Sequence, residues 1–182
     1  MDAMPSAADK DLAGVVATAA TGDDVAFARL VDAYHDDMRR VCAFITRDMG
    51  LAEDAVQTAW AIAWRRLGTV REPARLRSWL MRVAANEAKK SLRKRGRRIA
   101  LESLSVGFGA PVGVNPETGI DAVDLRKALA RLDADDRALL AMRYVAGFNA
   151  TELAEAIGIT PSGVRNRLER LTARLRQDLT DG

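Results

Sequence analysis

The feature that most constrains the fold of this chain is a four-residue break between two helical patterns near the C-terminus. Gly158 can adopt the left-handed backbone conformation that ends a helix, because it has no Cβ to clash. Thr160 is a favoured N-cap, and Pro161 suits the first helical position because its missing N–H group costs nothing there. We expect Ile159 to fill the gap between the two helices. The break therefore predicts two helices joined by a tight turn.

Both helices beside this break carry further signals. The first, residues 150–157, can be capped by Asn149, and Glu152 follows at the spacing of a capping box. The second, residues 161–179, has an apolar stripe at helical spacing. The stripe consists of Val164, Leu168, Leu171 and Leu175. Cap, turn and stripe together indicate a helix-turn-helix.

The other face of the second helix is basic, with five arginines and one glutamate between Arg165 and Arg176. A helix-turn-helix presents the N-terminal side chains of its second helix to base edges in the major groove. Arginine can bind guanine and asparagine can bind adenine, whereas phosphate contacts position the protein without specifying sequence. The candidates for base contact are Ser162, Arg165, Asn166, Glu169 and Arg170, and those for phosphate contact are Thr151, Arg167 and Arg174. An ordinary helical hairpin with an arginine-rich exposed face is the alternative interpretation.

The rest of the chain also favours an all-α protein. Hydrophobic residues make up 48% of the sequence but aromatic residues only 5%, and alternating runs of strand-favouring residues are hard to find. Asp23 or Asp24 can cap the second helix, and we expect Gly50 to end it. Helices are predicted over residues 10–20, 24–49, 52–67, 76–98, 123–132 and 134–145.

Changes in composition divide the chain into two small helical domains. The stretch from Ile99 to Ile120 contains four glycines and two prolines without sustained periodicity, which is typical of a flexible linker. The predicted parts are an N-terminal segment with a short helix at 1–23, a first domain at 24–98, a linker at 99–121 and a second domain at 122–182.

Although the net charge is only +3, the chain has a second basic segment, from Arg82 to Arg98, with eight basic residues and one acid. Two separate basic segments suit a polyanion contacted in two places. Solvated helix faces would give the same charge pattern.

Other functional classes find little support. Cys42 is the only cysteine and His35 the only histidine, so neither an internal disulfide nor a metal site built on them is expected, and a reducing, cytoplasmic setting follows. No apolar run reaches the ~20 residues needed to cross a bilayer. The sequence has no Gly-rich phosphate loop and no paired nucleophile and base. We therefore expect neither an enzyme nor a cofactor.

Four stretches, in order, resemble a known family. "GDDVAFARLVDAYHDDM", "AEDAVQTAW" and "SWLMRVAANEAKKSLRKRGRR" resemble parts of region 2 of bacterial RNA polymerase sigma factors, and the segment from "ALARLDADD" to "RQDL" resembles region 4. The order, the spacing and the short linker are similar to the extracytoplasmic-function group. The resemblance implies two helical domains that bind core RNA polymerase, recognise −35 and −10 promoter elements and promote DNA melting. It implies core polymerase, promoter DNA (duplex and melted non-template strand) and an anti-sigma factor as partners.

The resemblance also assigns roles to residues of the first domain. In the family, the helix matching residues 52–67 docks on the polymerase, and the following loop and helix read the non-template strand of the −10 element. The matching polymerase-binding positions are Asp54, Gln57, Thr58 and Ala61, and the −10 positions are Val70, Arg71, Arg82, Asn86, Lys89, Lys90 and Arg93. Thr58 stands where an acid is common, and Val70 where some members have an aromatic residue. The basic run from Arg93 to Arg98 either contacts DNA or is solvated.

Two other functions fit the same residues. A stand-alone dimeric helix-turn-helix regulator would use residues 24–98 for sensing or dimerisation and would bind a two-fold symmetric site. A helical module that only sequesters polymerase would bind the core enzyme without supporting transcription.

Overall fold

The structure, a computed structural model, describes residues 7–105 and 120–180 of the chain. These residues form helices and tight helical turns, and no strand occurs within the described ranges, as the composition predicts. The elements are α1 (Ala7–Ala20), α2 (Asp24–Thr46), α3 (Met49–Arg66), two 3₁₀ turns (Leu67–Thr69 and Pro73–Arg75), α4 (Leu76–Ser105), α5 (Ile120–Arg131), α6 (Ala134–Leu140), a π-helical turn (Ala141–Val145), α7 (Ala150–Ile157) and α8 (Pro161–Thr180).

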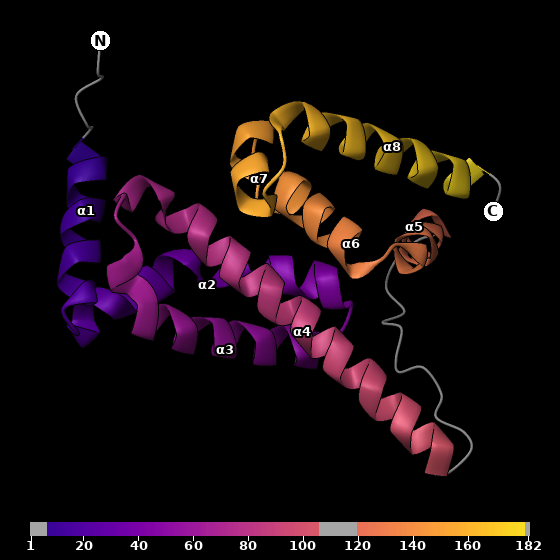
Figure 1. Cartoon of the computed structure of the whole chain (residues 1–182), viewed down its shortest axis with the longest axis horizontal. Helices are drawn as coiled ribbons and strands as arrows, with labels where there is room; N and C mark the ends of the chain where they lie inside the picture. Colours follow the sequence, from indigo (N-terminus) through magenta and orange to yellow (C-terminus); the bar gives the residue numbers. More distant parts are fainter. Residues whose placement is uncertain (1–6, 106–119, 181–182) are drawn as a thin grey trace.

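Helices α1 to α4 form the N-terminal domain (Figure 1). Asp23 caps α2 by accepting a hydrogen bond from the Ala26 amide at 2.7 Å. One side of α2 faces the core, where Leu30, Met38 and Val41 are buried against α3 and α4. Helix α1 packs on α2 and on the two 3₁₀ turns. This packing fixes the loop between α3 and α4 against the domain.

The prediction that Gly50 ends α2 was wrong. Helix α2 ends at Thr46, and Arg47 takes the left-handed backbone conformation with φ 57°. Asp48 then caps α3 by accepting a hydrogen bond from the Leu51 amide, so Gly50 lies in the first turn of α3. A capping aspartate placed directly after the αL residue starts the next helix earlier than the glycine suggested.

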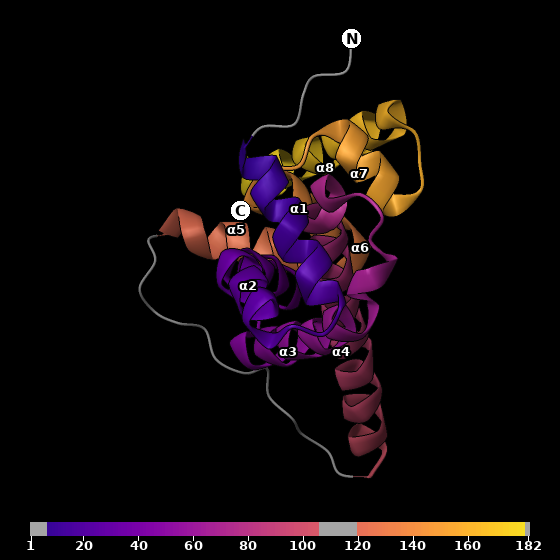
Figure 2. The ribbon, with the colours of Figure 1, turned by 90° about the vertical axis from the view of Figure 1, so that its left-hand side faces the viewer.

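Helix α4 is longer than its apolar pattern predicted. It continues past residue 98 to Ser105, into the stretch expected to be linker, and its C-terminal part projects beyond the other helices in both views (Figures 1 and 2). The remainder of the predicted linker, residues 106–119, lies outside the described residues. Ala100, Leu101 and Glu102 have good helix propensity, which favours this extension.

Helices α5 to α8 form the C-terminal domain. The predicted helix at 134–145 is divided here, because after Leu140 the backbone widens into a π-helical turn in which the Ala146 amide donates to the Ala141 carbonyl at 3.0 Å. This turn brings the buried ring of Phe148 back against the domain interior. A salt bridge of 3.4 Å between Arg131 and Asp178 ties α5 to α8.

The two domains pack on each other, which the sequence did not predict. Their buried apolar residues form one continuous cluster, with α6 and the π-helical turn against α2, and α6 and α7 against α4. Arg77 of α4 donates to the Ala146 carbonyl at 2.5 Å, and its guanidinium lies 5.0 Å from the centre of the Phe148 ring. Arg137 of α6 donates to the Ile45 carbonyl at the end of α2 at 2.8 Å.

Candidate nucleic-acid interface

The helix-turn-helix forms as the sequence predicts. Asn149 accepts hydrogen bonds from the Thr151 and Glu152 amides, and the Glu152 carboxylate accepts one from the Asn149 amide at 2.7 Å. Gly158 ends α7 in the left-handed conformation with φ 75°. Thr160 caps α8 by accepting from the Gly163 amide at 3.1 Å. Local hydrogen bonds thus define the turn.

The prediction for Ile159 was wrong, because its side chain is 42% exposed and does not fill the space between the helices. The buried side of α8 comes instead from Val164, Leu168 and Leu171, as predicted. With the turn this short, Ile159 lies over the outer side of the first turn of α8, near Gly163. It therefore adds an apolar patch beside the basic face.

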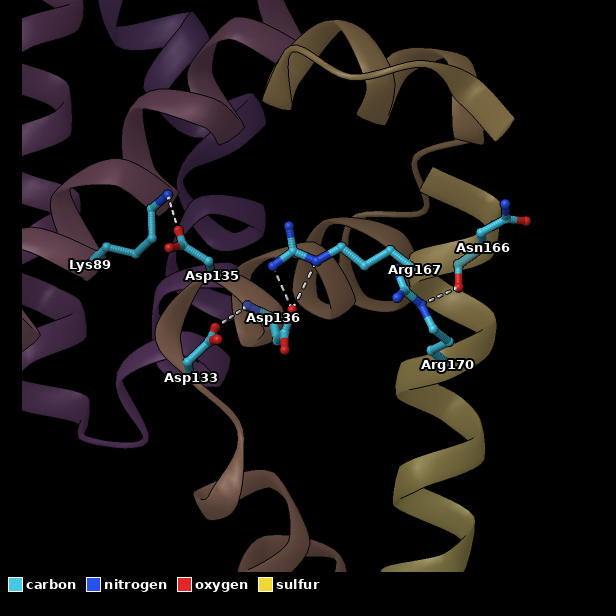
Figure 3. A network of polar contacts seen from close by, with 7 residues as sticks. All are labelled: Lys89, Asp133, Asp135, Asp136, Asn166, Arg167 and Arg170. Carbon is cyan, nitrogen blue, oxygen red and sulfur yellow. Dashed lines mark hydrogen bonds and ion pairs between the residues drawn. The ribbon is translucent and has the colours of Figure 1, made fainter. Parts of the chain in front are cut away.

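The predicted base-contact residues of α8 share one exposed face. Ser162, Arg165, Asn166, Glu169 and Arg170 are all exposed, and so are Thr151 and Arg174 among the phosphate candidates. Arg170 donates from its Nε to the Asn166 carbonyl at 3.3 Å, which leaves its remaining guanidinium donors for a ligand (Figure 3). This face presents hydrogen-bond donors and acceptors suited to base edges.

Arg167 differs from its neighbours on α8. Its Nε and Nη2 atoms donate to one oxygen of Asp136 at 2.9 and 2.5 Å, and this pair is partly buried (Figure 3). Asp136 belongs to the first turn of α6, where Asp133 caps the helix. Charge-assisted hydrogen bonds of this kind are about twice as strong as neutral ones. In this arrangement Arg167 joins α8 to α6, and its predicted phosphate contact remains a prediction.

The predicted polymerase-binding residues lie on one exposed face of α3. Asp54, Gln57, Thr58 and Ala61 are all exposed, and the Thr58 hydroxyl donates back to the Asp54 carbonyl at 2.8 Å. The hydroxyl is therefore turned toward its own helix. The face carries one carboxylate and one amide beside two small residues.

The loop before α4 and the start of α4 border a cavity of about 280 Å³. Val70 and Arg71 line it together with Arg82, so the structure brings three predicted −10 residues together. Across the cavity stand Glu152 and Glu155 of α7, and Glu155 pairs with Arg75 at 3.3 Å. Two acids of the C-terminal domain thus face the predicted strand-binding loop.

A second cavity, of about 390 Å³, lies between α4 and the C-terminal domain. Arg82, Asn86 and Lys89 line one side, and residues of α6, α7 and α8 line the other. Lys89 donates to Asp135 at 2.8 Å (Figure 3). This hydrogen bond from Lys89 holds the pKa of Asp135 below its usual range. In this arrangement, α6 and α7 would obstruct a DNA strand bound along Arg82, Asn86 and Lys89.

Four residues of this interface were not singled out from the sequence: Asp135, Asp136, Arg75 and Arg77. Asp135 and Asp136 follow a capping aspartate, and acidic residues stabilise the N-terminus of any helix. Their position in the sequence therefore indicated no further role. Only the fold shows that Asp135 faces α4 while its neighbour Asp136 faces α8 (Figure 3).

Cys42, Trp60 and Trp79 belong to the packed interior. Cys42 is fully buried, and this burial raises the pKa of its thiol to about 12, so the thiol stays protonated. Trp60 is buried and Trp79 partly buried, whereas Trp64 is 41% exposed and packs edge-on against Phe27. Among residues 7–105 and 120–180, no group of three or more His, Cys, Asp and Glu side chains is arranged to hold a metal ion.

The fold and the site define a class: an all-helical, two-domain protein with a basic recognition helix and a second basic helix. Comparisons with known families identify it further, because Sigma-70 region 2 matches residues 30–98 and Sigma-70 region 4 matches residues 122–175. The ECF RNA polymerase sigma-E factor of Escherichia coli is 30% identical over 82% of this chain and 84% of that protein. The chain belongs to the extracytoplasmic-function (ECF) group of RNA polymerase sigma factors.

Two further matches agree with this family. A probable RNA polymerase sigma factor, RfaY of Xanthomonas campestris pv. campestris, is 29% identical over 88% of this chain, which spans only 42% of that protein's length. The structure of the sigma factor RpoE with the anti-sigma factor NepR from Bartonella quintana matches with a TM-score of 0.68 at 25% identity, covering 85% of this chain and 96% of RpoE. No helix in the described parts of this chain is both long and apolar enough to span a bilayer.

Proposed function

We propose that this sigma factor reads a two-part promoter with two different helices. Helix α8 enters the −35 major groove through Ser162, Arg165 and Asn166 and their exposed neighbours. Helix α4 and the loop before it bind the melted −10 strand through Asn86 and the surrounding cations. The exposed face of α3 around Asp54 binds core RNA polymerase in the cytoplasm, and catalysis belongs to the polymerase.

The observation that carries this proposal is the presence of two unlike basic helices in one chain. Helix α8 is a capped recognition helix with an exposed polar face, suited to duplex DNA. Around α4, cations and an amide border cavities beside a half-buried Val70, which suits unpaired bases and a single-stranded backbone. A dimeric regulator would need only the first kind of surface.

Use of the −10 surface requires the two domains to separate. In the closed arrangement, α6 and α7 stand opposite Arg82, Asn86 and Lys89, and Asp135 holds Lys89. The contacts between domains combine buried apolar residues with hydrogen bonds and ion pairs, so binding of each domain to a different part of the polymerase has to replace both kinds. An anti-sigma factor, the partner of the similar RpoE structure, is a proposed partner of this chain as well.

Run-off transcription with purified core polymerase and a promoter library tests the proposal. We expect transcripts only when chain and core enzyme are both present, from promoters that share two separate, asymmetric elements. Binding of the chain alone to a palindrome would favour the dimeric regulator. Binding to core enzyme without any transcript would favour a module that sequesters polymerase. Either result would overturn the proposal.

A further inference from the structure

Helix α1 lies outside the two matched family regions, at residues 30–98 and 122–175, and has no part in the proposed function. One side of α1 is apolar, and its residues recur at helical spacing: Leu12, Val15, Val16 and Ala19. Of these, Val16 is 4% exposed and Ala19 is 3% exposed. With this side α1 packs on α2 and on the two 3₁₀ turns of the segment 67–75, here called the α3–α4 loop (Figure 1).

The connection from α1 to α2 is short and ordered by local contacts. Only Thr21, Gly22 and Asp23 separate the two helices. The Gly22 amide donates to the Ala19 carbonyl at 3.0 Å, and Gly22 takes the left-handed backbone conformation with φ 94°. Asp23 then caps α2. Because α2 is part of the domain core, this connection holds α1 at a fixed angle beside the α3–α4 loop.

The α3–α4 loop has few contacts of its own. The Val70 amide donates to the Leu67 carbonyl and the Arg75 amide to the Glu72 carbonyl, both at 2.9 Å, so both bonds close within the loop. In the described part of the chain, no hydrogen bond joins the loop to α1 or α2. Leu67 is buried, Val70 and Pro73 are half-buried, and the rest of the loop is exposed. The shape of the loop therefore depends on the elements that pack against it.

Two helices outside α3 and α4 contact this loop, and they belong to different domains. Helix α7 of the C-terminal domain faces it across the 280 Å³ cavity, where Glu155 pairs with Arg75 at 3.3 Å. Helix α1 belongs to the same domain as the loop, and none of its residues lines that cavity. When the domains separate, α7 leaves with the C-terminal domain and α1 remains. Support of Val70 and Arg71 then falls to α1.

We propose that α1 is a positioning element for −10 recognition, with Val16 as the positioning residue that seats it. By packing on the α3–α4 loop, α1 keeps Val70 and Arg71 in the arrangement that reads the DNA strand after α7 has left. The inference rests on the proposed function, because only that proposal gives Val70 and Arg71 a role at the −10 element. The −35 face of α8 and the exposed face of α3 are formed by other contacts, so loosening α1 leaves both of them intact.

The test compares three single variants of the full chain. Val16→Asp places a carboxylate on the buried side of α1, and burying an unpaired carboxylate is strongly unfavourable, so α1 loosens. Ala17→Asp adds the same charge at the adjacent, exposed position and is the matched control. Val16→Ile is the conservative variant and keeps the apolar contact. Run-off transcription with core polymerase is measured on promoter pairs that differ at one base of the −10 element or of the −35 element.

We expect Val16→Asp to reduce the ratio of transcript yields within the −10 pair by about fivefold, as the loss of one base contact does, and to leave the −35 ratio unchanged. A smaller folded fraction lowers all yields by one factor and changes neither ratio, so the ratios separate positioning from stability. Val16→Ile and Ala17→Asp should keep both ratios. An unchanged −10 ratio in Val16→Asp, or an equal loss in Ala17→Asp, would overturn the inference.

Hydrogen exchange of the loop gives a second readout that does not require transcription. The Val70 and Arg75 amides, which are bonded within the loop, should exchange about tenfold faster in Val16→Asp than in Ala17→Asp, while amides of α3 exchange alike. Val16→Ala, a milder change, serves the same comparison where Val16→Asp does not fold. Equal loop exchange would overturn the inference. Failure of the unmodified chain to direct run-off transcription would instead refute the proposed function, and hydrogen exchange would still decide whether α1 holds the loop.

Discussion

Helices α4 and α8 are both basic, but the fold presents them differently. On α8 the predicted base-contact residues are exposed and face away from the rest of the chain. On α4 the side chains of Arg82, Asn86 and Lys89 face the C-terminal domain across a cavity. Similar charge in the sequence thus gives one exposed surface on α8 and one surface on α4 that faces the other domain; under the proposed function, only the second depends on domain separation.

Two adjacent acids produce much of this difference. Asp136 holds Arg167 within the C-terminal domain, in a pair whose side chains are 16% and 35% exposed. Asp135 holds Lys89 across the domain boundary, and its side chain is 64% exposed. The first contact is part of the domain fold and the second is a weak, exchangeable contact. The recognition helix is therefore held within its own domain by Asp136, whereas the Lys89–Asp135 pair contributes little to the contact that covers α4.

Removing Asp136 should have the largest effect on stability. Asp136→Ala leaves the partly buried Arg167 without its acceptor, which should cost about 1.5–3 kcal/mol of unfolding free energy, because hydrogen bonds to charged groups carry that much. Asp135→Ala is the matched control and should cost at most about 1 kcal/mol, as exposed ion pairs do. Urea unfolding followed by circular dichroism measures both. Equal costs would contradict the distinction between the two acids.

Within α8, we expect Arg165 to contribute to DNA recognition and Arg167 to contribute to stability. We expect Arg165→Ala to weaken promoter use by about 1–3 kcal/mol, mainly at one position of the −35 element, without lowering the unfolding free energy, because Arg165 is exposed and makes no ion pair among the described residues. Transcription from −35 variants measures the first effect and urea unfolding the second. Unchanged discrimination among the variants would show that Arg165 does not read bases.

Arg77 is the residue whose removal should loosen the domain contact most. Arg77→Ala removes a hydrogen bond to Ala146, a cation–π contact with Phe148 and a 3.2 Å salt bridge to Asp37, together about 1–2 kcal/mol. Energy transfer between dyes on α2 and α8 should fall in the free chain. Arg40→Ala is the control, because Arg40 also pairs with Asp37, and both of these residues belong to α2. Unchanged energy transfer would mean that other contacts hold the domains together.

The smallest effect concerns salt and pH at Lys89–Asp135. Because Lys89 lowers the pKa of Asp135 from 3.8, this contact contributes fully above that value and is lost as the pH falls through the lowered pKa. From pH 5 to 7 the pair should therefore not make domain closure depend on pH, whereas added salt should weaken it. Energy transfer in Asp135→Asn, compared with the unmodified chain, isolates the pair. A transition near neutral pH that disappears in this variant would contradict the assignment.

Local signals predicted much of the fold and of the recognition helix. The caps at Asp23, Asn149 and Thr160 were predicted because a capping side chain bonds to amides within its own turn. The error at Gly50 also concerns a cap. Asp48 caps α3 two residues before Gly50, so Gly50 lies inside α3 and does not end α2. Ile159 was misplaced because its burial depends on how closely two helices approach, which spacing does not reveal.

The domain contact was beyond sequence reasoning. Arg77 and Phe148 lie far apart in the chain. Their residue types fit a surface cation and a core aromatic residue, so neither one indicates a contact between them. The π-helical turn at Ala141–Val145, which brings Phe148 into contact with Arg77, has no distinctive residue pattern. The roles of Asp135 and Asp136 likewise depend on which helices stand opposite them.

Cross-linking the two domains tests most directly whether they must separate. Arg75→Cys/Glu155→Cys replaces an ion pair between domains with two exposed thiols, which a short, cleavable bismaleimide can join. The buried Cys42, with its raised pKa, should not react. Asp36→Cys/Arg39→Cys, a pair within α2, is the control. Run-off transcription should be lost in the cross-linked chain and return after cleavage of the linker. It should persist in the cross-linked control. Full activity of the chain with its domains joined would contradict the account.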